Sequence, residues 1–89
     1  MASYQILYWK TIPAQVKVSD AGGRPVSRAL PERFQVEIDQ VAMKEGLIGT
    51  DAYLEQWHWT EKRNRPGSAE EVAQAVVQEL EQEFDSLRS

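Results

Sequence analysis

The only histidine of this chain, His58, is the residue best suited to acid–base chemistry, because an imidazole titrates near neutral pH. A catalytic imidazole also needs a carboxylate that orients it, and Glu55 and Glu61 each lie three residues away. In an extended segment, residues three apart point to opposite faces, so neither glutamate is a natural partner on the same strand. We therefore predict a packing or surface histidine and no enzyme, and an enzyme that uses His58 remains an alternative.

Other reactive groups are scarce in the sequence. There is no cysteine, which removes thiolate metal sites, disulfides and thiol nucleophiles together. The Gly22-Gly23 pair lacks the spacing of a phosphate-binding loop, and no calcium-loop pattern of aspartates is present. We predict no metal site, no cofactor and no small-molecule ligand.

The two tryptophans that bracket the histidine, Trp57 and Trp59, are the second feature with a functional meaning. In a strand they share one face, and each indole buries roughly 150–250 Å² when it is covered. One hypothesis places both rings in the core beneath the helices. The other leaves at least one indole exposed as an anchor for a partner, with Arg63 and Arg65 at its rim. Both hypotheses remain open at the level of sequence.

The length and composition of the chain limit the class of protein to which it can belong. The chain has 89 residues, of which 42% are hydrophobic and 27% charged, so we expect a single domain over residues 1–89. Its longest apolar run is far too short for a membrane span, and its start lacks a basic leader. We expect a cytoplasmic protein that does not insert into membranes.

The N-terminal third has the alternation of β-structure. Residues 4–11 are rich in aromatic and branched side chains and predict an interior strand, and residues 15–19 alternate as a half-buried strand does. Residues 20–23 (Asp-Ala-Gly-Gly) predict a turn, followed by a short return strand over residues 25–29.

Two helices follow from periodicity and end signals. Pro31 suits the first position of a helix over residues 31–45, and Gly46 suits its end. Ser68 and Glu71 form a capping-box pattern ahead of a second helix, whose apolar stripe runs to Leu87. Its acidic pairs at i,i+4 are predicted to form a solvated face.

The stretch between the helices allows two interpretations. Thr50 could cap a helix over residues 50–57, or residues 54–62 could form a strand with both indoles on one face. We favour the strand, because aromatic residues and alternation dominate. The predicted fold is then α+β, with the order β-β-(β)-α-β-α: a small antiparallel sheet of three to four strands and two helices packed on one face.

Nucleic-acid binding is the second class of function to weigh. Residues 26–57 match the order of a ribbon-helix-helix protein: a short strand, a helix opened by Leu30-Pro31, and a second helix capped by Thr50. Only Arg24 and Arg28 give that strand positive charge, and the chain has a net charge of −4. We keep this fold as an alternative and do not expect a nucleic-acid partner.

Three stretches together resemble a known family. They are residues 8–16 (Tyr-Trp-Lys-Thr-Ile-Pro-Ala-Gln-Val), residues 30–34 (Leu-Pro-Glu-Arg-Phe), and residues 53–59 with the helix start at 67–73. The chain resembles the small "virulence factor" domain family, a domain also found in conserved virulence factor C-type proteins. The resemblance spans about Tyr4 to Phe84. It implies a bacterial, cytoplasmic accessory or interaction module, and it carries no catalytic or binding residues over.

These observations lead to one expectation about function. We expect a non-enzymatic interaction domain that binds a protein partner, or a second copy of itself, through the sheet face that the helices leave bare. The candidate docking residues are Trp9, Tyr53, Trp57, Trp59, Arg63 and Arg65.

Overall fold

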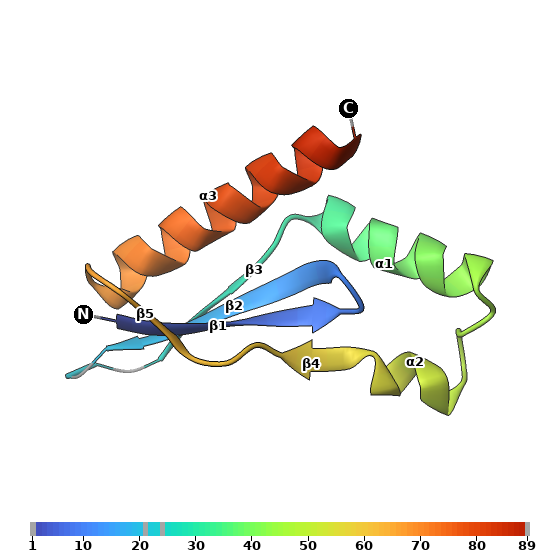
Figure 1. Cartoon of the computed structure of the whole chain (residues 1–89), viewed down its shortest axis with the longest axis horizontal. Coiled ribbons are helices and arrows are strands. Elements are labelled where there is room, and N and C mark those ends of the chain that lie inside the picture. Colours follow the sequence, from blue (N-terminus) through green and yellow to red (C-terminus); the bar gives the residue numbers. More distant parts are fainter. Residues whose placement is uncertain (1, 21, 24, 89) are drawn as a thin grey trace.

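A computed structural model describes residues 2–20, 22–23 and 25–88, except for the side chains of residues 87 and 88. These residues form five strands and three helices, whose arrangement is shown in Figure 1. In chain order they are β1 (Ala2–Trp9), β2 (Ile12–Asp20), β3 (Val26–Ala29), α1 (Glu32–Lys44), α2 (Asp51–Glu55), β4 (Trp57–Trp59), β5 (Arg63–Arg65) and α3 (Ala69–Arg88).

The five strands form one sheet with the order β3-β2-β1-β4, in which β5 also pairs with β1. Every pairing is antiparallel. β4 lies against the end of β1 at Leu7–Trp9, and β5 lies against its beginning at Ala2–Tyr4. The predicted α+β class is therefore confirmed, and the sheet has one strand more than expected.

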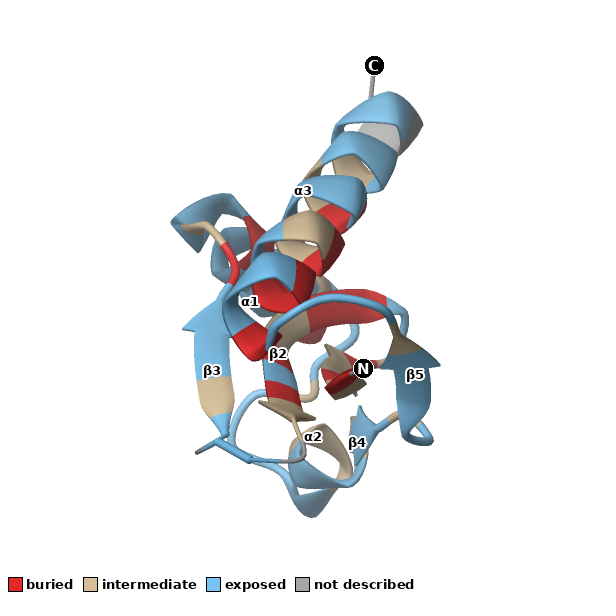
Figure 2. Cartoon of the chain, turned by 90° about the vertical axis from the view of Figure 1, so that its left-hand side faces the viewer, coloured by how far each residue is buried: buried red, intermediate tan, exposed pale blue. Residues whose placement is uncertain are grey.

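One face of the sheet is covered by α1 and α3 and holds most of the core (Figures 1 and 2). Alternate residues of β1 and β2, such as Ile6 and Val16, point to this face and are buried. The helices meet them with the apolar stripes predicted from periodicity. The buried residues of α1 and α3 are Phe34, Ile38, Ala42, Ala69, Val72, Ala73, Val76 and Leu80.

The helix ends agree with their sequence signals. Ser68 Oγ accepts a hydrogen bond from Glu71 N at 3.2 Å, and Glu71 Oε1 accepts one from Ser68 N at 3.4 Å, as a capping box requires. Gly46 has a φ of 69°, and Leu47 N donates to Ala42 O at 2.8 Å beyond the end of α1. Pro31 precedes α1 as its cap and is not its first helical residue.

The segment between the long helices combines both interpretations. Thr50 caps α2, and its Oγ1 accepts a hydrogen bond from Tyr53 N at 3.4 Å, but this helix has only five residues. The strand begins at Trp57, so a continuous strand over residues 54–62 is wrong at both ends. Figure 1 shows α2 on the opposite side of the sheet from α3.

The ribbon-helix-helix alternative does not fit this architecture. Its strand would pair with the strand of a second chain, whereas β3 pairs with β2 of the same chain, from Val18↔Val26 to Gln15↔Ala29. Its second helix would be α2, which is too short to pack as a full helix.

Arg24, Ala21 of the predicted turn and the Leu87 side chain lie outside the described residues. In the part of the chain that is described, no helix combines the length and apolar character needed to cross a bilayer.

Candidate functional site

The register between β1 and β4 decides where the two bracketing tryptophans point. Trp57 lies opposite Trp9, and Trp59 lies opposite Leu7. Directly opposed residues share a face of the sheet. On β1, Leu7 and Trp9 lie on the opposite face from Ile6, which points to α1 and α3. Trp57 and Trp59 therefore also point away from these two helices. The predicted common face of the two indoles is confirmed. Of the two open hypotheses, the one that places both rings beneath the helices is wrong.

Trp9 is not a surface residue, although the sequence suggested it for docking. It is 0% exposed, and its Nε1 donates a hydrogen bond to the Tyr53 carbonyl oxygen at 2.9 Å. The ring centroids of Trp9 and Tyr53 lie 5.5 Å apart, and Trp57 meets Tyr53 edge-on at 6.2 Å. Trp9 belongs to the hydrophobic core, and Tyr53 and Trp57 pack against it, so these three rings attach α2 to the sheet.

Trp59 is the member of the pair that reaches solvent, with 44% of its surface exposed. The backbone at this position is also turned outward. Thr60 N donates to Ile6 O at 3.0 Å, and Lys10 N donates to Gln56 O at 3.1 Å. Because antiparallel bonding alternates along a strand, the N–H and C=O groups of Trp57 and Trp59 then point away from β1.

The two arginines predicted at the rim of the indoles lie on the other face. Arg63 pairs with Tyr4 and Arg65 with Ala2, both on the face covered by α3. Between the pairs Leu7↔Trp59 and Tyr4↔Arg63, β1 advances three residues while its partner advances four. One extra residue inverts the alternation, as a β-bulge does. The prediction that Arg63 and Arg65 form a rim around the exposed indole, on its face of the sheet, is therefore wrong.

Arg65 has a partner of its own on α3. Its two terminal nitrogens donate to the carboxylate of Glu79 at 3.0 and 2.5 Å. The hydrogen bond from Arg65 lowers the pKa of the Glu79 carboxyl. Arg63 is exposed beside it.

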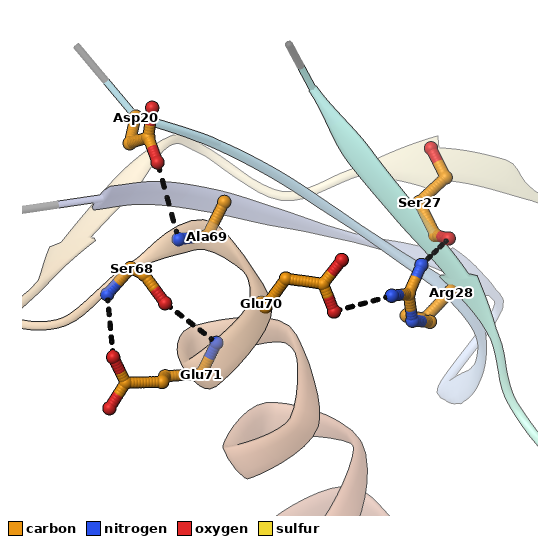
Figure 3. Close-up of polar contacts among 7 residues, drawn as sticks. All are labelled: Asp20, Ser27, Arg28, Ser68, Ala69, Glu70 and Glu71. Carbon is orange, nitrogen blue, oxygen red and sulfur yellow. Dashed lines mark hydrogen bonds and ion pairs between the residues drawn. The ribbon is translucent and has the colours of Figure 1, made fainter. Parts of the chain in front are cut away.

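Several acids of α3 are used in the same way, so the helix is more than the solvated acidic face that was predicted. Figure 3 shows Glu70 paired with Arg28 at 2.7 Å, close to the capping box at Ser68. In the same view the Asp20 carboxylate accepts a hydrogen bond from Ala69 N at 3.4 Å. Negative charge at a helix N-terminus is stabilising, so β2 helps to fix where α3 begins.

His58 points to the α3 face and packs on Tyr8, with ring centroids 5.9 Å apart and an interplanar angle of 17°. Its Nδ1 lies 3.1 Å from the Gln56 carbonyl oxygen, and the residue is exposed. This imidazole is thus oriented by a backbone carbonyl and a phenol ring. Neither contact is the carboxylate that general acid–base catalysis uses.

A cavity of about 290 Å³ lies where α1, α3 and the β1–β2 hairpin meet, and we call it the Tyr8 cavity. Its polar wall includes Tyr8, Glu37 and Glu83, and its apolar wall includes Ile12, Leu80 and Phe84. Burial, and then the charge of Glu83, raise the pKa of the Tyr8 phenol. Sequence analysis missed this site, because its residues come from four elements (β1, β2, α1 and α3) and no local pattern links them.

Comparison with known proteins identifies one relationship. A protein-family model described as "Virulence factor" matches residues 7–88 of the chain. No curated protein and no solved structure matches.

Proposed function

The chain belongs to the Virulence factor family, and we propose that it acts as a non-enzymatic interaction domain that binds an extended, acidic segment of another protein. The binding surface is the outer edge of the sheet formed by residues 57–65, which we call the Trp59 edge. A bacterial cytoplasm is part of the proposal, since a chain without cysteine needs no oxidising compartment.

The observation that carries the proposal is the open backbone of this edge. In the described part of the chain, β4 and β5 pair only with β1. The peptide groups of Trp57 and Trp59 therefore face outward and can pair with an added strand. An edge of this kind presents both sheet faces to a partner, so Trp59 on one face and Arg63 on the other can act together.

Trp59 supplies the apolar part of the contact. A half-exposed indole on an open strand is the residue type most enriched among binding hot spots. It also has a rigid side chain, so its burial by a partner costs little conformational entropy.

Charge indicates the chemistry of the partner. The Trp59 edge contains Lys62, Arg63 and Arg65 against Glu61, a net charge of +2 in a chain whose total is −4. Glu79 compensates Arg65, but Lys62 and Arg63 are exposed. An acidic segment is therefore attracted to this edge and repelled by the rest of the molecule.

The test is a comparison of variants in affinity capture from a lysate of the source organism. Proteins retained by the wild-type chain should be lost with Trp59→Ala and reduced with Arg63→Glu. They should be kept by Ile48→Ala, which removes an apolar side chain elsewhere that is more exposed than Trp59 (55% against 44%). Retention should also weaken as salt is raised, because exposed charges are screened.

Two outcomes would contradict the proposal. Equal recovery with Trp59→Ala and Ile48→Ala would show that the Trp59 edge is not the binding surface. A dimer in analytical ultracentrifugation that Trp59→Ala dissociates would assign the edge to a second copy of the chain and overturn the choice of an acidic partner.

A further inference from the structure

The sheet has a second outer strand, β3, at the end opposite to the Trp59 edge (Figure 2). Among the described residues, β3 pairs only with β2. Leu30 N, just after the strand, donates to Ala14 O at 3.1 Å. Because antiparallel bonding alternates along a strand, the N–H and C=O groups of Ser27 and Ala29 then point outward. This outer side of β3, which we call the β3 edge, offers the groups that an added strand uses.

One of these outward groups is already bound within the chain. The Ser27 carbonyl oxygen accepts a hydrogen bond from Arg28 Nη1 at 3.1 Å. The other terminal nitrogen of Arg28, Nη2, donates to the Glu70 carboxylate on α3 at 2.7 Å, which holds the guanidinium beside the strand (Figure 3). A strand that adds at the β3 edge needs the same carbonyl oxygen, so it has to compete with Arg28.

Symmetry limits the ways in which a second copy of the chain could add here. When the helices of both copies cover the same side of a joined sheet, a two-fold axis passes through the β3 edge, and opposed residues lie on the same face. In one register, Ser27 of each copy lies opposite Ala29 of the other, and each such pair exchanges both of its hydrogen bonds. In the other register, Ser27 lies opposite Ser27. Both registers use the Ser27 carbonyl.

Each register also meets a second obstacle. When Ser27 lies opposite Ala29, Arg28 lies opposite Arg28 of the second copy, and like charges directly opposite each other are destabilising. When Ser27 lies opposite itself, Ala29 lies opposite Pro25, which has no N–H to donate. Arg28 therefore opposes the first register by its charge and both registers by its hydrogen bond.

We propose that Arg28, anchored by Glu70, is a cap that prevents a second copy of the chain from pairing at the β3 edge. A sheet with two open edges could extend from one copy to the next without closing. The cap removes this path and leaves the Trp59 edge as the one that accepts a strand. It does not depend on what binds at the Trp59 edge.

The experiment compares two double variants that both keep the net charge of −4. Arg28→Ala/Glu70→Ala, the uncapped variant, removes the cap and its anchor. Arg33→Ala/Glu81→Ala removes a different ion pair between the body of the domain and α3, and is the matched control. In analytical ultracentrifugation the uncapped variant should dimerise with a dissociation constant at least about tenfold below that of the wild-type chain. A like-charge contact and the competition for a carbonyl oxygen are then both gone, whereas the control should match the wild type.

Amide hydrogen exchange locates the contact. The Ser27 and Ala29 amides point outward in the single chain and should exchange quickly, and both should become protected in the dimer. Adding Trp59→Ala to the uncapped variant should leave its dimer intact, so failure of this proposal and failure of the proposed function are distinguishable. If the alanine substitutions unfold the chain, Arg28→Thr/Glu70→Gln makes the same test with a better strand former and an uncharged side chain of the same shape.

Three results would overturn the proposal. In the first, the uncapped variant associates no more strongly than the wild-type chain. In the second, the Arg33→Ala/Glu81→Ala control associates as strongly as the uncapped variant, so that loss of any ion pair to α3 has the same effect. In the third, a dimer forms while the Ser27 and Ala29 amides stay unprotected.

Discussion

Replacing Trp9 by phenylalanine should loosen α2 and β4 from the sheet while the core beneath α1 and α3 stays folded. Trp9 is 0% exposed, and it holds α2 through one hydrogen bond to the Tyr53 carbonyl and one ring contact. A helix of five residues is not stable without such tertiary contacts. Trp9→Phe keeps an aromatic ring in place and removes the indole N–H.

The size of the effect follows from what the substitution leaves behind. The Tyr53 carbonyl keeps a second hydrogen bond, from Gln56 N at 3.3 Å, so losing the indole donor should cost about 1 kcal/mol rather than the upper end of the range for an unsatisfied group. The smaller ring gives up roughly another 1 kcal/mol of buried apolar contact. The total of about 2 kcal/mol is well below the stability of a typical domain.

Urea unfolding followed by far-UV circular dichroism measures this loss, and amide hydrogen exchange locates it. The Tyr53 and His58 amides should lose protection before those of α3 do. Trp57→Phe is the matched control, because it removes the same atoms from a half-buried ring and should cost less than about 1 kcal/mol. If the two substitutions cost the same, or if protection in α2 is unchanged in Trp9→Phe, the structural role assigned to Trp9 is incorrect.

Three further predictions concern α3 and its contacts. Ser68→Ala should lower the free energy of unfolding by about 1 kcal/mol in the same urea assay, because Glu71 N loses its acceptor, and an unchanged midpoint would rule out the capping box. NMR titration should give Glu79 a pKa below its ordinary 4.5, and Arg65→Gln should bring it back towards that value. Because the Glu79 pKa is lowered on folding, the ion pair with Arg65 stabilises the folded state above the unfolded pKa. That stabilisation is lost as pH falls through the folded pKa. Ultraviolet absorbance should show Tyr8 ionising above its ordinary pKa of 10.0, and Glu83→Gln should bring its pKa closer to that value. Because this pKa is raised on folding, the domain should lose stability as pH rises from the unfolded pKa through the folded one, and a Tyr8 titration unaffected by Glu83→Gln would contradict the contribution of Glu83.

The long helices and most of the strands could be predicted because their causes are local. A capping box, an apolar stripe and a glycine at the C-terminal end of a helix (Gly46 after α1) each act within a few residues. The structure has all three where the sequence indicates them. The common face of Trp57 and Trp59 could be predicted for the same reason, since alternation is a property of a single strand.

The short elements could not be predicted with the same certainty. Residues 50–57 combine a helix cap with strand-forming residues, and their tertiary contacts decided between the two. Trp9 offers a hydrogen bond to the Tyr53 carbonyl, and β1 offers a partner strand from Trp57 onward. The chain therefore changes from helix to strand at Gln56.

The sequence by itself determined the α+β class and the two long helices with their ends. It also determined that the indoles of Trp57 and Trp59 share one face of a strand. Only the tertiary structure decided which indole is exposed, which face the arginines at 63 and 65 occupy, and that Tyr8, Glu37 and Glu83 share a cavity. The physical reason is the range of the interactions. Periodicity and capping act along a few residues of chain, whereas strand register, an extra residue opposite β1 and the meeting of four elements depend on pairings between distant segments.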